Sequence, residues 1–149
     1  MTELFSDDYF MNQALREAKQ AFDKDEVPIG AVIVYKNKIV ARAHNLTETL
    51  NDPTAHAEMQ ALTAAADALG AKYLNECTLY VTVEPCVMCA GATYWAQIGR
   101  IVFGTDDNKR GYTGFNSKII HPQTSVTGGV MRQECAELMT RFFYKLRSV

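Results

Sequence analysis

The sequence lacks any apolar run long enough to cross a membrane. Its longest apolar stretches are short, such as residues 29–35, whereas a membrane-spanning helix needs about 20 consecutive apolar residues. The first eight residues are acidic and lack the basic and then apolar segments of a secretory signal. We therefore expect a soluble, cytoplasmic protein with no membrane partner.

Internal repeats and low-complexity segments are also absent, and cysteine is scarce. The chain of 149 residues contains four cysteines, two of them in the Cys-x-x-Cys pattern of Cys86 and Cys89. Without an export signal, this pattern favours metal or redox chemistry over disulfides. Cys77 and Cys135 are then expected to be buried thiols. With 48% hydrophobic residues, residues 1–149 are predicted to form one domain.

Charge is distributed unevenly along the chain. Residues 1–108 contain 8 Lys+Arg and 15 Asp+Glu, a net charge of −7, and residues 109–149 contain 7 and 2, a net charge of +5, so the total is −2. The basic part also contains Phe142, Phe143 and Tyr144. Basic side chains beside aromatic rings can hold phosphates and stack on bases, which favours a polynucleotide contact. A C-terminal amphipathic helix with its aromatic residues in the core is the alternative interpretation.

Hydrophobic periodicity predicts an alternation of helices and strands. Phe10, Ala14, Ala18 and Phe22 recur every four residues, which indicates a helix over 7–22 with Ser6 as its cap. Further helices are predicted over 52–69, 86–98 and 132–147, and strands over 31–35, 39–43, 78–83 and 100–103. Residues 105–129 are predicted to form a long loop with at most one short strand, and loops of that length are usually functional or mobile.

This order predicts an α/β protein whose mixed sheet has helices on both faces. Strands joined through helices are expected to run parallel. His56 and Cys86 then each lie at a helix N-terminus, on either side of one crevice at the edge of the sheet.

The most informative residues are His56 and Glu58, followed by Cys86 and Cys89. One imidazole and two thiolates are three zinc ligands, and a zinc site with three protein ligands keeps its fourth position for water. Zinc lowers the pKa of that water toward 7, and a nearby carboxylate can take the proton and return it to a leaving group. The pattern therefore predicts hydrolysis, with Glu58 as the catalytic residue.

The spacing of His56 and Glu58 raises a geometric difficulty. Residues two apart in a helix lie roughly 200° apart around its axis, so the two side chains cannot share a face in mid-helix. We expect Glu58 to reach the metal only if His56 lies in the first turn, where the backbone is still bending.

A structural zinc site or a redox Cys-x-x-Cys pair is the alternative to catalysis. A structural site needs a fourth ligand, and nothing in the spacing of Cys77, Cys135, His44 or His121 recommends one of them. A redox pair leaves His56 and Glu58 unexplained.

The pattern resembles that of the zinc-dependent nucleoside and nucleobase deaminases, in which His-x-Glu is followed by Pro-Cys-x-x-Cys. Within that superfamily the chain is most similar to bacterial tRNA-specific adenosine deaminases. The likeness is dense as far as residue 104 and is carried by residues 26–31, 43–45, 52–59, 78–92 and 103–104.

The resemblance implies conversion of the wobble adenosine of a tRNA anticodon to inosine. One zinc ion per subunit would be held by His56, Cys86 and Cys89, with Glu58 moving the proton. Asn45 would contact the target nucleotide, Asp107 would lie in a loop that touches the flanking RNA, and Phe143 would belong to the RNA-binding surface. The resemblance also implies a three-layer α/β/α cytidine-deaminase-like fold with about five strands, and a homodimer that binds the anticodon stem-loop across both subunits.

Two segments depart from that family. Residues 93–96 replace a polar segment and look more like bacterial guanine deaminases, although packing also explains the pair Tyr94 and Trp95. The loop over 111–128 is shorter and lacks an Asn-His pair. A free nucleobase or nucleoside deaminase of the guanine or cytosine type is therefore the alternative function, and a catalytically silent, zinc-stabilised RNA-binding module is a remote one. An open basic approach favours tRNA, and an enclosing lid favours a free base.

Overall fold

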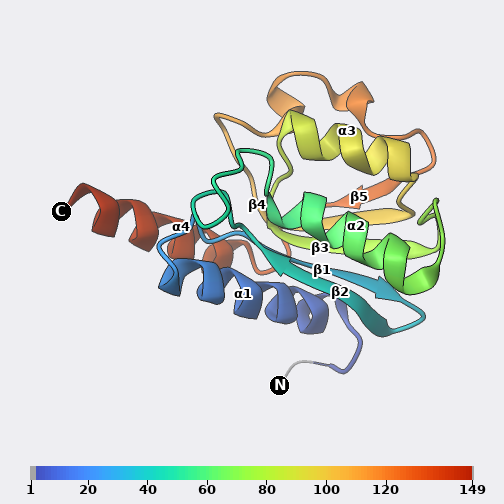
Figure 1. Cartoon of the computed structure of the whole chain (residues 1–149), viewed down its shortest axis with the longest axis horizontal. Helices are drawn as coiled ribbons and strands as arrows, with labels where there is room; N and C mark the ends of the chain where they lie inside the picture. Colours follow the sequence, from blue (N-terminus) through green and yellow to red (C-terminus); the bar gives the residue numbers. More distant parts are fainter. Residues whose placement is uncertain (1–2, 149) are drawn as a thin grey trace.

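A five-stranded mixed sheet runs through the centre of the computed structural model, which describes residues 3–148 (Figure 1). The spatial order of the strands is β2-β1-β3-β4-β5. Their bounds are β1 Gly30–Tyr35, β2 Lys38–His44, β3 Cys77–Val83, β4 Arg100–Thr105 and β5 Ser125–Thr127. Strand β1 pairs antiparallel with β2 and β3, whereas β3–β4 and β4–β5 are parallel. The expected parallel pairing of the later strands is confirmed.

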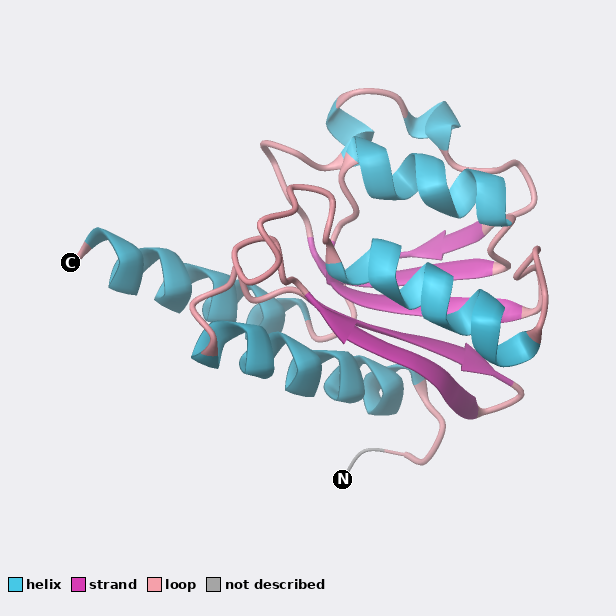
Figure 2. Ribbon diagram, viewed as in Figure 1, coloured by secondary structure: helices cyan, strands magenta, loops and turns pink. Residues whose placement is uncertain are grey.

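Four helices cover the two faces of the sheet. They are α1 Asp7–Asp23, α2 Ala57–Leu69, α3 Val87–Ala96 and α4 Arg132–Arg147. Helices α1 and α4 lie on one face, and α2 and α3 lie on the other (Figure 2). The predicted three-layer α/β/α architecture is confirmed. Among residues 3–148, no helix is long and apolar enough to span a bilayer.

Alternation along the strands divides the core between the two faces. In β1, Ile33 packs under α2, whereas Val32 and Val34 pack against α1. In β3, Leu79 packs on the α2 side of the sheet and Tyr80 packs on the α1 side. Successive side chains of a strand point to opposite faces, so one sheet buries both helical layers.

Helix α1 lies unusually close to the sheet because Gly30 has no side chain. A Cβ at this position would collide with the carbonyl oxygen of Ala14 and the amide of Ala18. The helix begins at the predicted cap, since the Ser6 hydroxyl accepts a hydrogen bond from the Tyr9 amide at 3.1 Å.

Helices α2 and α3 begin later than the sequence indicates. The prediction placed His56 and Cys86 inside first turns, but both are N-cap residues with extended backbones, at ψ 153° and ψ 174°. Asp52, expected to start a helix, instead folds back on a turn and accepts hydrogen bonds from the amide and hydroxyl of Thr54. His56 and Cys86 therefore project from the ends of their helices rather than from the sides.

The segment after β4 has more structure than a long loop. It contains two short 3-10 helices, η1 Tyr112–Gly114 and η2 Ser117–Ile119, and then β5. A backbone bridge between Cys86 and Gly111, and a hydrogen bond from the Tyr112 amide to the Pro85 carbonyl, attach this segment to the start of α3.

Candidate active site

The N-termini of α2 and α3 meet at one edge of the sheet, where β2 and β3 end and β1 begins (Figure 1). His56 caps α2 and Cys86 caps α3, while Cys89 follows in the first turn of α3. Helix N-termini carry partial positive charge and unpaired N–H groups, which favour thiolates. The fold thus places all three predicted ligands together.

The separations within this cluster match those of a zinc site. His56 Nδ1 lies 3.6 Å from Cys86 Sγ and 3.5 Å from Cys89 Sγ. Zinc bonds of about 2.0–2.1 Å to nitrogen and about 2.3 Å to sulfur, at a tetrahedral angle, give an N···S separation of about 3.6 Å. His56, Cys86 and Cys89 are the one group of three or more possible metal ligands among residues 3–148, so the site offers three ligands and leaves a fourth position open.

The two thiols influence one another strongly. The hydrogen bond from Cys89, together with the His56 imidazole, lowers the pKa of Cys86 to about 4. The hydrogen bond with Cys86, together with burial, raises the pKa of Cys89. The hydrogen bond to Cys86 also raises the pKa of His56. A zinc ion needs both thiolates and a neutral imidazole, so its binding displaces the protons that this cluster otherwise shares.

Glu58 reaches the cluster, which resolves the difficulty of its spacing. His56 is an extended cap rather than a helical residue, so the helical angle between the two positions does not apply. Glu58 is buried at 3% exposure and lines the same cavity as His56 and Cys86. Burial raises the pKa of its carboxyl to about 7. A carboxyl of that pKa suits proton transfer near neutral pH.

A cavity of about 870 Å³ opens beside the cluster. Six of the seven predicted site residues line it, namely Asn45, His56, Glu58, Cys86, Asp107 and Phe143. The seventh, Cys89, is fully buried. Sequence reasoning did not single out its other polar and basic lining residues, which include Thr47, Lys109, Arg110 and Arg147. The last three are cations, and the same lining includes the acidic residues Glu84, Asp106 and Asp107, so the charge at the pocket is mixed.

The two phenylalanines of α4 have different environments. Phe142 is buried at 5% exposure and packs edge-on against Phe22 of α1. Phe143 is 38% exposed and lines the cavity. The core interpretation is therefore confirmed for Phe142, whereas Phe143 faces the cavity and its contact with a polynucleotide stays a prediction.

Asn45 and Asp107 lie on two loops at the rim. The Asn45 Oδ1 accepts a hydrogen bond from the Thr47 amide at 3.3 Å. Asp107 Oδ1 accepts from the Lys109 and Arg110 amides, both at 3.0 Å, and so stabilises its own turn. The Asn45 Nδ2 makes no hydrogen bond within residues 3–148, and this donor remains available to a ligand.

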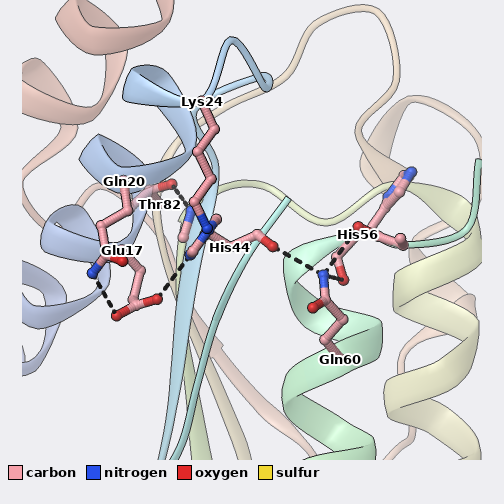
Figure 3. A network of polar contacts seen from close by, with 9 residues as sticks. Glu17, Gln20, Lys24, His44, His56, Gln60 and Thr82 are labelled. Atoms are coloured by element: carbon pink, nitrogen blue, oxygen red, sulfur yellow. Dashed lines mark hydrogen bonds and ion pairs between the residues drawn. The ribbon is translucent and has the colours of Figure 1, made fainter. Parts of the chain in front are cut away.

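A polar network supports the start of α2 from behind (Figure 3). His44 lies between Glu17 and Lys24, each 3.0 Å from one ring nitrogen. The Gln60 amide donates to the backbone carbonyls of His44 and Ala55 and lies 3.5 Å from that of His56. This network connects the backbone just before Asn45 to the backbone at His56.

Tyr94 and Trp95 do not pack in the core. Trp95 is 78% exposed, and Tyr94 is 38% exposed with its ring 5.2 Å from that of His121. The packing interpretation is therefore wrong for Trp95 within a single chain, whereas Tyr94 packs partly against His121.

Comparisons with known proteins extend the likeness along the whole chain. A family model described as MafB19-like deaminase matches residues 5–147. The tRNA-specific adenosine deaminase of Bacillus subtilis (strain 168) is 44% identical over 146 residues, which cover 95% of this chain and 91% of that protein. A solved structure from work on A-to-I editing by tRNA:A34 deaminases at the wobble position of transfer RNA is 42% identical, with a TM-score of 0.81, covering 87% of this chain and 98% of the other.

A solved guanine deaminase from Bacillus subtilis is also similar, but over a shorter part. It is 40% identical with a TM-score of 0.63, and the match covers 66% of this chain and 63% of the other. The likeness to the tRNA enzymes therefore extends over more of the chain at similar identity.

Proposed function

Since the chain belongs to the family of tRNA-specific adenosine deaminases, we propose that it hydrolyses the wobble adenosine of a tRNA anticodon to inosine and ammonia. The observation that carries this proposal is the convergence of His56, Cys86, Cys89 and the buried Glu58 beside a cavity whose lining also includes Lys109, Arg110 and Arg147. The full-length likeness to tRNA enzymes supports the substrate.

In the proposed reaction, water adds to C6 of adenine and the C6–N bond breaks. When bound by His56, Cys86 and Cys89, one zinc ion per chain supplies the nucleophile by lowering the pKa of water toward 7. Glu58 accepts the proton released from that water and donates a proton to the departing amine, so that ammonia leaves and inosine remains. Burial keeps Glu58 away from bulk water, which would otherwise exchange that proton.

Three residues are proposed to hold the substrate. Asn45 can donate from Nδ2 to the target nucleotide, and Phe143 offers a ring face for stacking an unpaired base. Asp107 would meet the nucleotides that flank the target. Lys109, Arg110 and Arg147 surround the same cavity and can contact phosphates of the anticodon stem-loop.

We also propose a homodimer that forms through the outer side of α3. Trp95, Phe115 and Val87 are 78%, 65% and 40% exposed on α3 and the neighbouring η1–η2 segment. Large apolar side chains that are exposed in a single chain are typical of protein interfaces. Four free cysteines and a tRNA substrate together favour a cytoplasmic location.

Replacing Trp95 with glutamate is expected to shift the protein from dimer to monomer in sedimentation velocity, because a charge would be buried in an apolar interface. Tyr144→Glu is the matched control, since Tyr144 is 71% exposed on α4, away from this surface. A Trp95→Glu protein that sediments as the wild type would exclude this interface.

The function is tested by incubating zinc-loaded protein with an anticodon stem-loop that carries adenosine at position 34. The expected product is inosine, measured by mass spectrometry after nuclease digestion. Parallel reactions with guanine and cytosine test the alternative, which the local likeness to a guanine deaminase supports. Deamination of a free base, without inosine in the RNA, would overturn the tRNA assignment.

A further inference from the structure

Two buried glutamates at the same edge of the sheet have no counter-cation. Glu26 is fully buried just before β1, and Glu84 is 4% exposed immediately after β3. Strands β1 and β3 are antiparallel neighbours, so the start of one lies beside the end of the other. No lysine, arginine or histidine within residues 3–148 forms an ion pair with either carboxylate. A buried carboxylate without a cation is costly unless hydrogen bonds satisfy it.

Each carboxylate is satisfied by a different rim loop, in the same pattern. Glu26 Oε1 accepts from the Glu48 amide at 3.0 Å, and its Oε2 accepts from the amide and hydroxyl of Thr49, both at 2.6 Å. Burial by itself raises the pKa of Glu26, but these hydrogen bonds outweigh it and lower the pKa below its ordinary value.

Glu84 repeats this arrangement on the other side of the cavity. Its Oε1 accepts from the Asp107 amide at 3.2 Å, and its Oε2 accepts from the amide and hydroxyl of Thr113 at 3.1 and 2.7 Å. Gly111 makes room for it, because a Cβ there would collide with the Glu84 carboxylate. Each glutamate thus binds two backbone amides and one threonine hydroxyl of an otherwise exposed loop.

The two anchored loops carry the proposed substrate contacts. Asn45 and Thr47 precede the residues held by Glu26, and Asp107 donates its own amide to Glu84. Resting on the function proposed above, we infer that Glu26 and Glu84 are paired positioning residues: each holds one rim loop and places Asn45 or Asp107, respectively, over the cavity. Glu26 does not line the cavity, and Glu84 lines it with both of its carboxylate oxygens already accepting hydrogen bonds from the loop.

Amide hydrogen exchange of the zinc-loaded protein tests the anchoring independently of activity. In Glu84→Gln, an NH2 group replaces one acceptor oxygen and the remaining oxygen loses its negative charge. One loop hydrogen bond is then lost and the other is weakened, so we expect exchange of the Asp107 and Thr113 amides to rise, by about tenfold or more at the amide that loses its acceptor. Exchange of the Glu48 and Thr49 amides should be unchanged in Glu84→Gln. In Glu26→Gln, exchange of the Glu48 and Thr49 amides should rise and that of Asp107 and Thr113 should be unchanged. Equal acceleration in both loops, or in neither, would overturn the pairing.

Kinetics on the stem-loop test the positioning. Because Asp107 is assigned to flanking RNA, Glu84→Gln should mainly raise KM, whereas Glu26→Gln should mainly lower kcat through Asn45. Displacement of such a loop can cost about 10²-fold in kcat/KM. A purely structural role would reduce active enzyme and leave KM unchanged in both variants.

Double variants make the assignment specific. Asp107→Ala should lower kcat/KM much less in the Glu84→Gln background than in the wild type. Asn45→Ala should lower kcat/KM as much in the Glu84→Gln background as it does in the wild type. Gly111→Ala should reproduce the Glu84→Gln phenotype, because its Cβ would displace the Glu84 carboxylate. If Glu84→Gln and Gly111→Ala both fail to fold, Thr113→Val, which removes only the hydroxyl that binds Glu84, takes their place. Additive losses in every pair would sink the inference. If the wild type makes no inosine, the proposed function fails, while hydrogen exchange still decides the anchoring.

Discussion

Replacing Glu58 with alanine is expected to lower the rate of inosine formation by about 10²–10⁴-fold while the zinc content stays at one ion per chain. The variant removes a buried carboxyl that lines the cavity beside the ligands, whereas the other buried carboxylate there, Glu84, is already engaged by the Asp107 and Thr113 amides. It removes no ligand, because the cluster consists of His56, Cys86 and Cys89. Without Glu58, nothing accepts the proton from the attacking water or supplies one to the amine.

Glu58→Gln is the matched control for this experiment. Glutamine keeps the size and a hydrogen-bonding end but cannot exchange a proton, so its activity should fall as far as that of the alanine variant. Metal analysis and single-turnover rates with the stem-loop are measured on the same preparations. Activity within tenfold of the wild type, in a zinc-loaded Glu58→Ala protein, would rule out the assigned role.

The arrangement of layers could be predicted from the sequence because each element repeats a local pattern. Alternation in β3 and the four-residue period of α1 are properties of neighbouring residues, and both elements lie where predicted. The starts of α2 and α3 were less predictable. An Asp followed by Pro and Thr is typical of a helix start, but here the Asp52 carboxylate accepts from the Thr54 amide and forms a separate turn. The helix then begins after His56, whose backbone is extended.

That His56, Cys86 and Cys89 lie together could be predicted from their sequence pattern, but the groups that hold the rim loops could not. Glu84 meets Thr113, and Glu26 meets Thr49, across loops that no periodic pattern links. The bidentate pair of Arg100 with Asp7 joins residues even further apart, and the hydrogen bond from Arg100 lowers the pKa of Asp7. Such pairs follow from tertiary structure, so a single sequence does not reveal them.

The exposure of Trp95 shows a different limit. A tryptophan on a short apolar helix is usually buried, and α3 has a buried face of Cys89, Ala90 and Thr93. The same helix exposes Tyr94 and Trp95. Periodicity does not distinguish a core face from an interface face, because both exclude water and differ only in what covers them.

Replacing Cys89 with alanine is expected to remove zinc and to lower Tm by about 10 °C. Cys89 is fully buried and provides one of the three ligands. A bound ion at 100 to 1,000 times its Kd stabilises the folded state by about 2.7–4.1 kcal/mol, and each kcal/mol shifts Tm by about 2–4 °C in a chain of this size. Calorimetry and metal analysis measure both effects.

Cys77→Ala separates loss of the metal from loss of a buried thiol. Cys77 is also buried, at 2% exposure, but lies in β3 outside the cluster. This variant should keep one zinc ion and lose only its packing contribution. Chelation of the wild type should lower its Tm most of the way to that of Cys89→Ala, because both lose the ion and the variant additionally loses the packing of one buried thiol. Chelation should not change the Tm of Cys89→Ala itself. An active, zinc-replete Cys89→Ala protein would show that the ligand set is wrong.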